Sequence, residues 1–339
     1  MSEVHLGCPP NHSGPHISRF TISLPPRVEA IDDRMNLVRG KVYEVDEDGD
    51  LVVTRRKPLK DSFVIFVQHS ITSSIPRVGL QVWRAELVLA DFVLHMTYNK
   101  SSGFDGVVAV ELGSGTGLVG MLLSRAANTV FITVYKMWSR LMFRMEEKIY
   151  TVDGLDTLDK GDEVLENCAK NVNLNAGNFH HEASIYVREL DWNHPWPPVV
   201  VADPPSKQSF GWISSELEKL QSASLLLAAD VIYSDDLTDA FFSCLEAIMS
   251  SGSEKVLFLA LEKRYNFSID DLDVVANGYS HFRSYLKVEE EEGDALETEF
   301  PQRFVGRPIN LEEIPQYVHE YERGNDVEIW KIRYTGPKR

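Results

Sequence analysis

The chain has 339 residues, of which 43% are hydrophobic and 25% charged, a balance typical of a globular protein with one large apolar core. Its formal net charge of -17 argues against strong independent binding to nucleic acid, because affinity for a phosphate backbone comes from Lys and Arg. No apolar run reaches the roughly 18 residues of a membrane span, and the N-terminus lacks a signal-peptide pattern. We therefore expect a monomer of the cytoplasm or nucleus without a membrane partner.

The three cysteines, Cys8, Cys168 and Cys244, lie far apart and have no His or Cys neighbours at ligand spacing. This pattern favours free thiols over a disulfide framework, and it gives no metal site.

The N-terminal quarter of the chain divides into two segments. Residues 1–30 are rich in Pro, His and Ser, and we expect them to be a disordered leader. Residues 31–78 are expected to form a small β-rich segment. Within it, apolar residues alternate on both sides of Asp48-Gly49, which predicts a hairpin, and residues 63–71 read as a further strand.

From residue 79 to 339, helical and strand patterns alternate, as in a doubly wound α/β domain with a mostly parallel sheet. The helices are expected within residues 78–96, 117–127, 161–175 and 235–252. The strands are expected within residues 106–112, 130–138, 184–192, 222–233, 255–264 and 327–334.

A glycine-rich loop follows the first of these strands. The strand delivers Glu111 to its carboxyl end, and Gly113, Gly115 and Gly117 then turn the chain into a helix, where a backbone without side chains can approach a ligand closely. Gly115 to Gly120 also fits the dinucleotide motif G-x-G-x-x-G. Counting from the first glycine misses that spacing, however, and an acid directly before the glycines suits a ligand with a cationic amino-acid end, such as S-adenosylmethionine.

Three motifs in this order carry a resemblance to a known family. ELGSGTG (111–117), ELDW (189–192) and AADVIY (228–233) resemble the class I methyltransferases, whose Rossmann-like sheet has seven strands. DVIY resembles more narrowly the Asp-x-x-Tyr signature of family 16, the protein-lysine methyltransferases. The resemblance covers about residues 40–339 and implies S-adenosylmethionine as cofactor and a partner protein carrying the target lysine.

The resemblance also implies roles for individual residues. The methionine part of the cofactor would be held by Glu111 and by Gly113, Ser114, Gly115, Thr116 and Gly117. Asp191 and Trp192 would flank the adenine, and Trp83 would close over the cofactor. The segment from Ala229 to Tyr233 would form the floor near the methyl group, with Asp230 and Tyr233 orienting the substrate amine. Aromatic core packing for the two tryptophans, and a helix N-cap for Asp230, remain alternatives.

The second strand departs from the family pattern, which ends this strand with an acid that accepts hydrogen bonds from the ribose. Here VFITVYKMW (130–138) contains none. Removing residues 134–158 joins the strand to Asp159, which would then stand where the acid belongs. We therefore expect an insertion at 134–158. It is either a lid or partner-binding helix, or translated intron sequence; we favour the second, because the segment interrupts a ligand-binding strand end.

Two other functions stay open at this stage. Asp203-Pro204-Pro205-Ser206 resembles the Asp-Pro-Pro-aromatic loop of nucleic-acid amino-methyltransferases, although the aromatic is missing and the net charge is unfavourable. A non-catalytic binding module would result if the insertion abolished cofactor binding. The preferred hypothesis is an S-adenosylmethionine-dependent protein-lysine methyltransferase.

Overall fold

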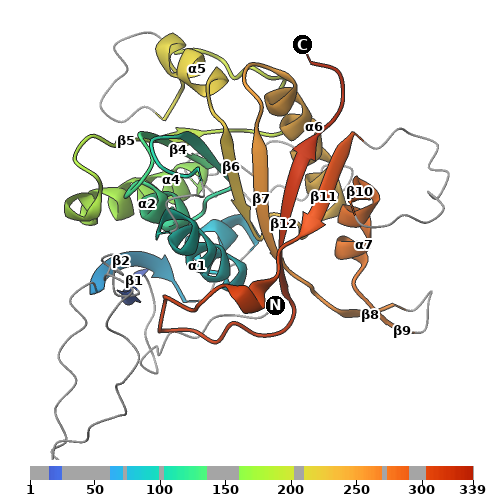
Figure 1. Ribbon diagram of the computed structural model, residues 1–339, viewed down its shortest axis with the longest axis horizontal. Coiled ribbons are helices and arrows are strands. Elements are labelled where there is room, and N and C mark those ends of the chain that lie inside the picture. The colour runs from blue at the N-terminus through green and yellow to red at the C-terminus, as the bar shows by residue number, and fades with distance from the viewer. Residues whose placement is uncertain are drawn as a thin grey trace, which may run out of the picture.

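The computed structural model describes residues 15–24, 62–71, 75–98, 103–135, 160–201, 210–268, 273–289 and 303–338. Its centre is a twisted sheet with the strand order β5-β4-β3-β6-β7-β12-β11-β10 (Figure 1). The strands are β3 (Val108–Leu112), β4 (Thr129–Val134), β5 (Ser184–Glu189), β6 (Leu225–Ala229), β7 (Val256–Glu262), β10 (Leu286–Val288), β11 (Phe304–Pro308) and β12 (Val327–Tyr334).

All neighbouring strands of this sheet are parallel except at β12, which runs antiparallel to both β7 and β11. The expected doubly wound, mostly parallel α/β fold is confirmed. The sheet has eight strands where seven were expected, because the short strand β10 adds to the outer edge of β11. Both faces of the sheet are buried, which explains the continuous apolar runs of its central strands.

Helices cover the sheet in two sets: α1 (Arg84–Tyr98), α2 (Leu118–Leu123) and α4 (Lys160–Leu174) on one face, and α5 (Ser214–Gln221), α6 (Asp235–Ser250) and α7 (Asn277–Ser284) on the other. The strands alternate accordingly. Ala109 of β3 belongs to the first core and Val110 to the second. A small hairpin of β8 (Asn266–Ser268) and β9 (Asp273–Val275) projects beside β7 and α7 (Figure 1). In the described ranges, no helix has the length and apolarity needed to cross a membrane.

A two-stranded antiparallel sheet packs against the main domain near α4. It consists of β1 (Pro15–Ser23) and β2 (Ser62–Ser70). The strand expected at 63–71 is confirmed, whereas the expectation of disorder for residues 1–30 is wrong over β1. Disorder was expected from the Pro, His and Ser content, but buried and more exposed side chains alternate along β1, with Ser18, Phe20 and Ile22 buried on one side. The hairpin expected around Asp48-Gly49 lies outside the described residues.

Asn171 of α4 and Asn175, the residue directly after α4, hold this hairpin through the backbone of β2. The Asn175 side chain accepts a hydrogen bond from Phe66 N at 2.9 Å and donates to Phe66 O at 2.7 Å, and so closes the pair as a neighbouring strand would. Asn171, one helical turn earlier, does the same for Gln68 at 2.7 and 3.0 Å. A row of side-chain amides thus replaces a third strand at the edge of β2.

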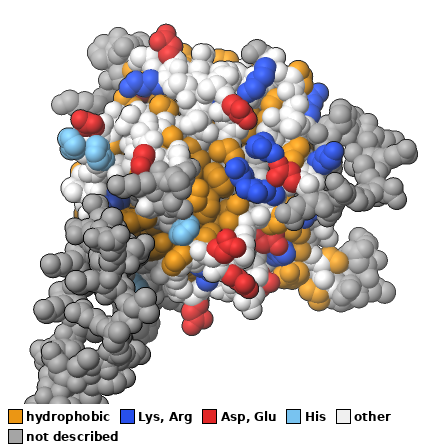
Figure 2. All heavy atoms as spheres, in the orientation of Figure 1, with side chains coloured by type: hydrophobic (Ala, Val, Ile, Leu, Met, Phe, Trp, Pro, Cys, Tyr) orange, Lys and Arg blue, Asp and Glu red, His pale blue; other side chains and the backbone are white. Residues whose placement is uncertain are grey.

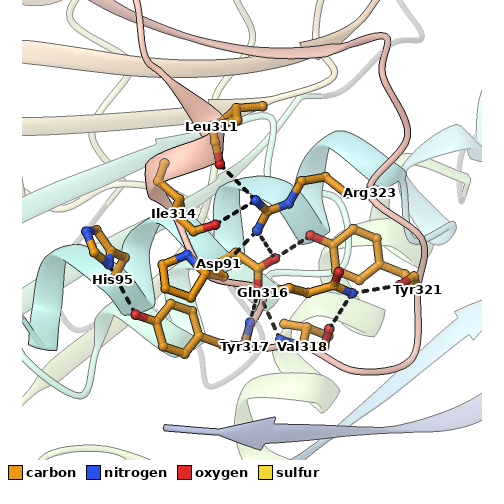
Figure 3. Close-up of polar contacts among 10 residues, drawn as sticks. Asp91, His95, Leu311, Ile314, Gln316, Tyr317, Val318, Tyr321 and Arg323 are labelled. Atoms are coloured by element: carbon orange, nitrogen blue, oxygen red, sulfur yellow. Dashed lines mark hydrogen bonds and ion pairs between the residues drawn. The ribbon is translucent and has the colours of Figure 1, made fainter. Parts of the chain in front are cut away.

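The C-terminal part of the chain is tied to helix α1 by a buried carboxylate (Figure 3). Asp91 is fully buried and accepts hydrogen bonds from Tyr317 N at 2.8 Å, Val318 N at 2.9 Å and the Tyr321 hydroxyl. Arg323 completes the group with an ion pair at 2.8 Å. Because four donors converge on one carboxylate, this contact fixes α1, whose N-terminus borders the glycine loop.

We predict that Asp91→Ala lowers the free energy of unfolding by about 3 to 5 kcal/mol, because it removes the acceptor of two buried backbone N–H groups and of the Tyr321 hydroxyl and leaves the partly buried Arg323 guanidinium without its counter-charge. Chemical denaturation followed by circular dichroism measures the change. Glu322→Ala is the matched control: its side chain is exposed between Tyr321 and Arg323, so a change within about 0.5 kcal/mol is expected. Equal effects of the two substitutions would contradict this role for Asp91.

Candidate active site

The carboxyl ends of β3, β4, β5 and β6 meet at one edge of the sheet, at the point where the strand order reverses around β3. In open α/β sheets this is where ligands bind. The glycine loop leaves β3 at this point and enters α2. Its Gly113, Gly115 and Gly117 have φ values of 69°, 52° and 82°, a left-handed backbone that glycine adopts without a steric penalty.

The loop is packed closely on its inner side. A Cβ atom on Gly115 would lie 3.0 Å from the carbonyl oxygen of Gly79, and one on Gly117 would lie 2.8 Å from Cys168 Sγ of α4. The side chains of Ser114 and Thr116 are also buried, with Ser114 Oγ donating to Thr133 O at 3.0 Å. Only Gly113 and Gly115 keep partly exposed backbone, so the loop offers main-chain groups to a ligand.

Glu111 stands at the end of β3, as expected, but its side chain turns away from the strand end. It is 1% exposed, and its Oε2 accepts a hydrogen bond from Gly120 N in α2 at 2.9 Å. A Cβ on Gly120 would lie 2.6 Å from that oxygen, which explains why a glycine stands there. Burial raises the pKa of Glu111 well above its usual range, and the nearby Glu86 adds to the rise. The structure thus gives Glu111 a role in holding the loop onto α2.

Glu86 in the first turn of α1 is a site residue that the sequence analysis missed. Its Oε1 accepts a hydrogen bond from Thr116 Oγ1 at 2.6 Å, and its Oε2 accepts one from Trp83 N at 3.4 Å. Burial raises its pKa to about 7, and the charge of Asp230 contributes to this rise. The available signal was an acidic residue within the apolar stretch RAELVLADFVL, because such a residue needs a specific partner once it is buried.

Asp230 lies directly after β6, the last residue of which is the partly buried Ala229. Among the described non-glycine residues it alone has a positive φ, of 55°. Its Oδ2 forms an ion pair with Arg264, whereas its buried Oδ1 has no hydrogen-bond partner. Burial raises the pKa of Asp230 to about 6, against the opposing charge of Arg264. The N-cap alternative is wrong, because Ser234 occupies the N-cap of α6.

Two aromatic residues named by the family resemblance, Tyr233 and Trp83, are connected with this ion pair in different ways. Tyr233 follows Asp230 after three residues and is 37% exposed. Trp83 precedes α1, donates its indole N–H to Val78 O at 3.0 Å, and has the Arg264 guanidinium carbon 5.3 Å from its ring centroid. Arg264 therefore contacts both the Trp83 ring and the Asp230 carboxylate. The sequence analysis could not find this contact, because the three residues are far apart in the chain.

Asp191 and Trp192 follow β5 and differ in exposure. Asp191 Oδ1 accepts a hydrogen bond from Asn193 N at 2.9 Å, and Oδ2 contacts His194 Nδ1 at 2.7 Å. Trp192 is only 4% exposed. Its ring stacks on Tyr135 with 4.5 Å between the ring centroids and packs edge-on against Phe241 at 5.1 Å. These contacts fit the alternative of aromatic core packing.

The first two residues of the expected insertion belong to the fold. Val134 ends β4, and its carbonyl accepts a hydrogen bond from Leu190 N at 3.0 Å. The Tyr135 hydroxyl accepts one from Asn193 Nδ2 at 2.7 Å. Residues 136–158 and Asp159 lie outside the described residues, as does the segment from Asp203 to Ser206.

Comparisons with known proteins identify the family of the chain. A family model described as lysine methyltransferase matches residues 61–152. Human methyltransferase-like protein 22 is 31% identical, over 85% of this chain and 70% of that protein, and its mouse counterpart is 30% identical, over 96% and 80%.

Among solved structures, the chain is similar to magnesium protoporphyrin IX methyltransferase from Synechocystis with bound S-adenosylmethionine, at 8% identity over 78% of this chain and 85% of that one. The TM-score of 0.35 is too low to carry an argument. The two mammalian relatives decide the assignment, because both share about a third of their residues with this chain over most of their length. This chain therefore belongs to the methyltransferase-like protein 22 family of class I methyltransferases, which use S-adenosylmethionine.

Proposed function

We propose that this methyltransferase acts on a lysine side chain of a partner protein and that Asp230 receives the substrate amine. The observation that carries the proposal is the free, buried Oδ1 of Asp230 beside an oxygen already paired with Arg264. A buried acceptor without a donor is costly, and in native structures it marks a strained or catalytic group or a position that a water, an ion or a ligand completes. The left-handed backbone of Asp230 adds local strain of the kind found at functional sites.

The residues around the loop fit a cofactor with a sulfonium and an amino group. Glu86, Glu111, Asp230 and Glu262 are each at most 7% exposed, and Arg84 and Arg264 form ion pairs with Glu262 and Asp230. Acidic side chains outnumber these two arginines, which disfavours a phosphate ligand, although the raised pKa values of Glu86 and Glu111 reduce the negative charge that a cationic ligand would meet. We assign the cofactor to the exposed backbone of Gly113 and Gly115, with Asp191 beside it. When bound, S-adenosylmethionine supplies the electrophilic methyl group.

The protein must present a neutral amine in line with that methyl group. A lysine in water has a pKa of about 10.4, and removal from water beside a sulfonium lowers it. Asp230, with a pKa of about 6, is too weak a base to deprotonate such an amine by itself. Its Oδ1 instead accepts a hydrogen bond from the amine and orients the nitrogen, while the proton leaves to solvent. We place the partly exposed Tyr233, three positions after Asp230, beside the same amine.

A nucleic-acid substrate is less compatible with the surface. Figure 2 shows Lys and Arg side chains interspersed with Asp and Glu over the face in view, without a continuous basic stripe. The net charge of -17 points the same way.

We predict that Gly115→Ala lowers the affinity for S-adenosylhomocysteine at least tenfold in isothermal titration calorimetry, because the added methyl group meets Gly79 O at 3.0 Å and displaces the loop. Gly103→Ala is the matched control. It imposes a similar backbone strain at φ 75°, but nothing lies within 4 Å of its Cβ, so only stability should fall. If wild-type protein gave no binding heat, the non-catalytic module would be favoured instead.

Methyl transfer should rise with pH through about pH 6, because Asp230 must be ionised to bind the amine and its pKa is raised to about 6. We predict that Asp230→Asn lowers the rate at least tenfold and removes this acid limb, while cofactor affinity stays within about threefold. The rate of label transfer to extract proteins, measured from pH 5 to 8, gives the profile. An unchanged acid limb in Asp230→Asn would assign it to another group.

Labelled S-adenosylmethionine incubated with the enzyme and cell extract should yield methyl-lysine in protein. Separate digestions identify the product class: protease should release the label, and nuclease should leave it in large molecules. Label that nuclease releases and protease does not would favour the nucleic-acid alternative.

A further inference from the structure

Helix α4 lies between the N-terminal hairpin and the glycine loop, and it contacts both. Toward the loop, Cys168 Sγ fills the space below Gly117, and a Cβ on Gly79 would lie 2.8 Å from Val164 Cγ1. Toward the hairpin, Asn171 and Asn175 bond the backbone of β2. One helix therefore fixes two segments that are far apart in sequence.

Asn171 alone among these asparagines bonds both neighbours. Its Oδ1 accepts a hydrogen bond from Gln68 N at 2.7 Å, and its Nδ2 donates to Gln68 O and to Thr116 O, each at 3.0 Å. The side chain is fully buried. Both amide hydrogens and the amide oxygen are thus engaged with backbone groups, so no other rotamer keeps all three bonds.

The Thr116–Gly117 peptide is held at both ends as a result. Its carbonyl oxygen bonds Asn171, and its N–H donates to Ser114 O at 2.9 Å, which closes the turn around Gly115. A rotation of this peptide would break both bonds and move Gly115, one of the two loop residues with exposed backbone. The orientation of the loop amides hence depends on the Asn171 side chain, which also binds the backbone of β2.

We propose that Asn171 is a positioning residue that sets the glycine loop for cofactor binding and couples that loop to the docking of the β1–β2 hairpin. The inference rests on the proposed cofactor site at this loop. Coupling of this kind is reciprocal: a docked hairpin strengthens cofactor binding, and bound cofactor stabilises the docked hairpin to the same extent.

The first test compares one substitution in α4 with one directly after the end of α4, by titration calorimetry with S-adenosylhomocysteine on the full chain. Asn171→Ala and Asn175→Ala each remove one clamp on β2, and both should lower the melting temperature. Only Asn171→Ala frees Thr116 O, so its affinity should fall about tenfold while Asn175→Ala stays within about twofold of wild type. Equal affinities in all three proteins, or equal losses in both variants, would overturn the proposal.

The second test needs no variant that must fold. Hydrogen exchange of the wild-type peptide covering residues 62–70 should slow when S-adenosylhomocysteine is saturating, because the amide of Gln68 is bonded to Asn171. Unchanged exchange despite measured binding overturns the coupling and leaves the cofactor site intact. Failure of wild-type protein to bind at all would instead refute the proposed site, and the coupling with it.

Discussion

The close approach of backbone to backbone at the turn from β3 to α2 is the constraint on which the rest of the site depends. Gly115 meets the carbonyl of Gly79, Gly117 rests on Cys168, and Gly120 leaves room for the carboxylate of Glu111. Any side chain at these positions would push the loop and α2 away from the segment of Gly79, from α4 and from β3. Because the glycines remove that barrier, three elements converge on one loop, and the loop can expose its main chain to a ligand.

The same convergence concentrates acidic groups in a place that water does not reach. Glu86 and Glu111 are brought together under the loop; the charge of Glu86 raises the pKa of Glu111, and the charge of Asp230 raises the pKa of Glu86. Desolvation is the larger cause for both, and hydrogen bonds from Thr116 and Gly120 only partly offset it. Burial thus favours the neutral form of both carboxyl groups, which hold the loop through hydrogen bonds more than through charge.

Elements outside the doubly wound sheet hold this arrangement in place. Asp91 fixes α1 to the C-terminal segment through four donors, and asparagines in α4 and directly after it attach the N-terminal hairpin by side-chain amides. Both devices satisfy backbone groups that would otherwise be buried without partners. They connect the two ends of the chain to the helices that flank the glycine loop.

The sequence by itself determined the alternation of α1, α2, α4 and α6 with β3 to β7 and β12, the glycine loop and the acids at the ends of β3, β5 and β6, but it did not reveal α5, α7 or β8 to β11. It could do so because period-two and helical apolar patterns, glycine turns and residues at strand ends are local features. The alternation of buried side chains in β1 is also a local feature, but the Pro, His and Ser content of residues 1–30 led to an expectation of disorder.

Only the tertiary structure decided which of these groups meet. Arg264 pairs with Asp230, Glu86 bonds Thr116, and Asn171 reaches both Gln68 and Thr116, although each pair is separated by at least thirty residues. It also turned Glu111 and Trp192 inward, where their positions in the motifs had suggested contact with a ligand. The reason is physical: side-chain direction and burial depend on packing between distant elements, which local sequence patterns do not encode.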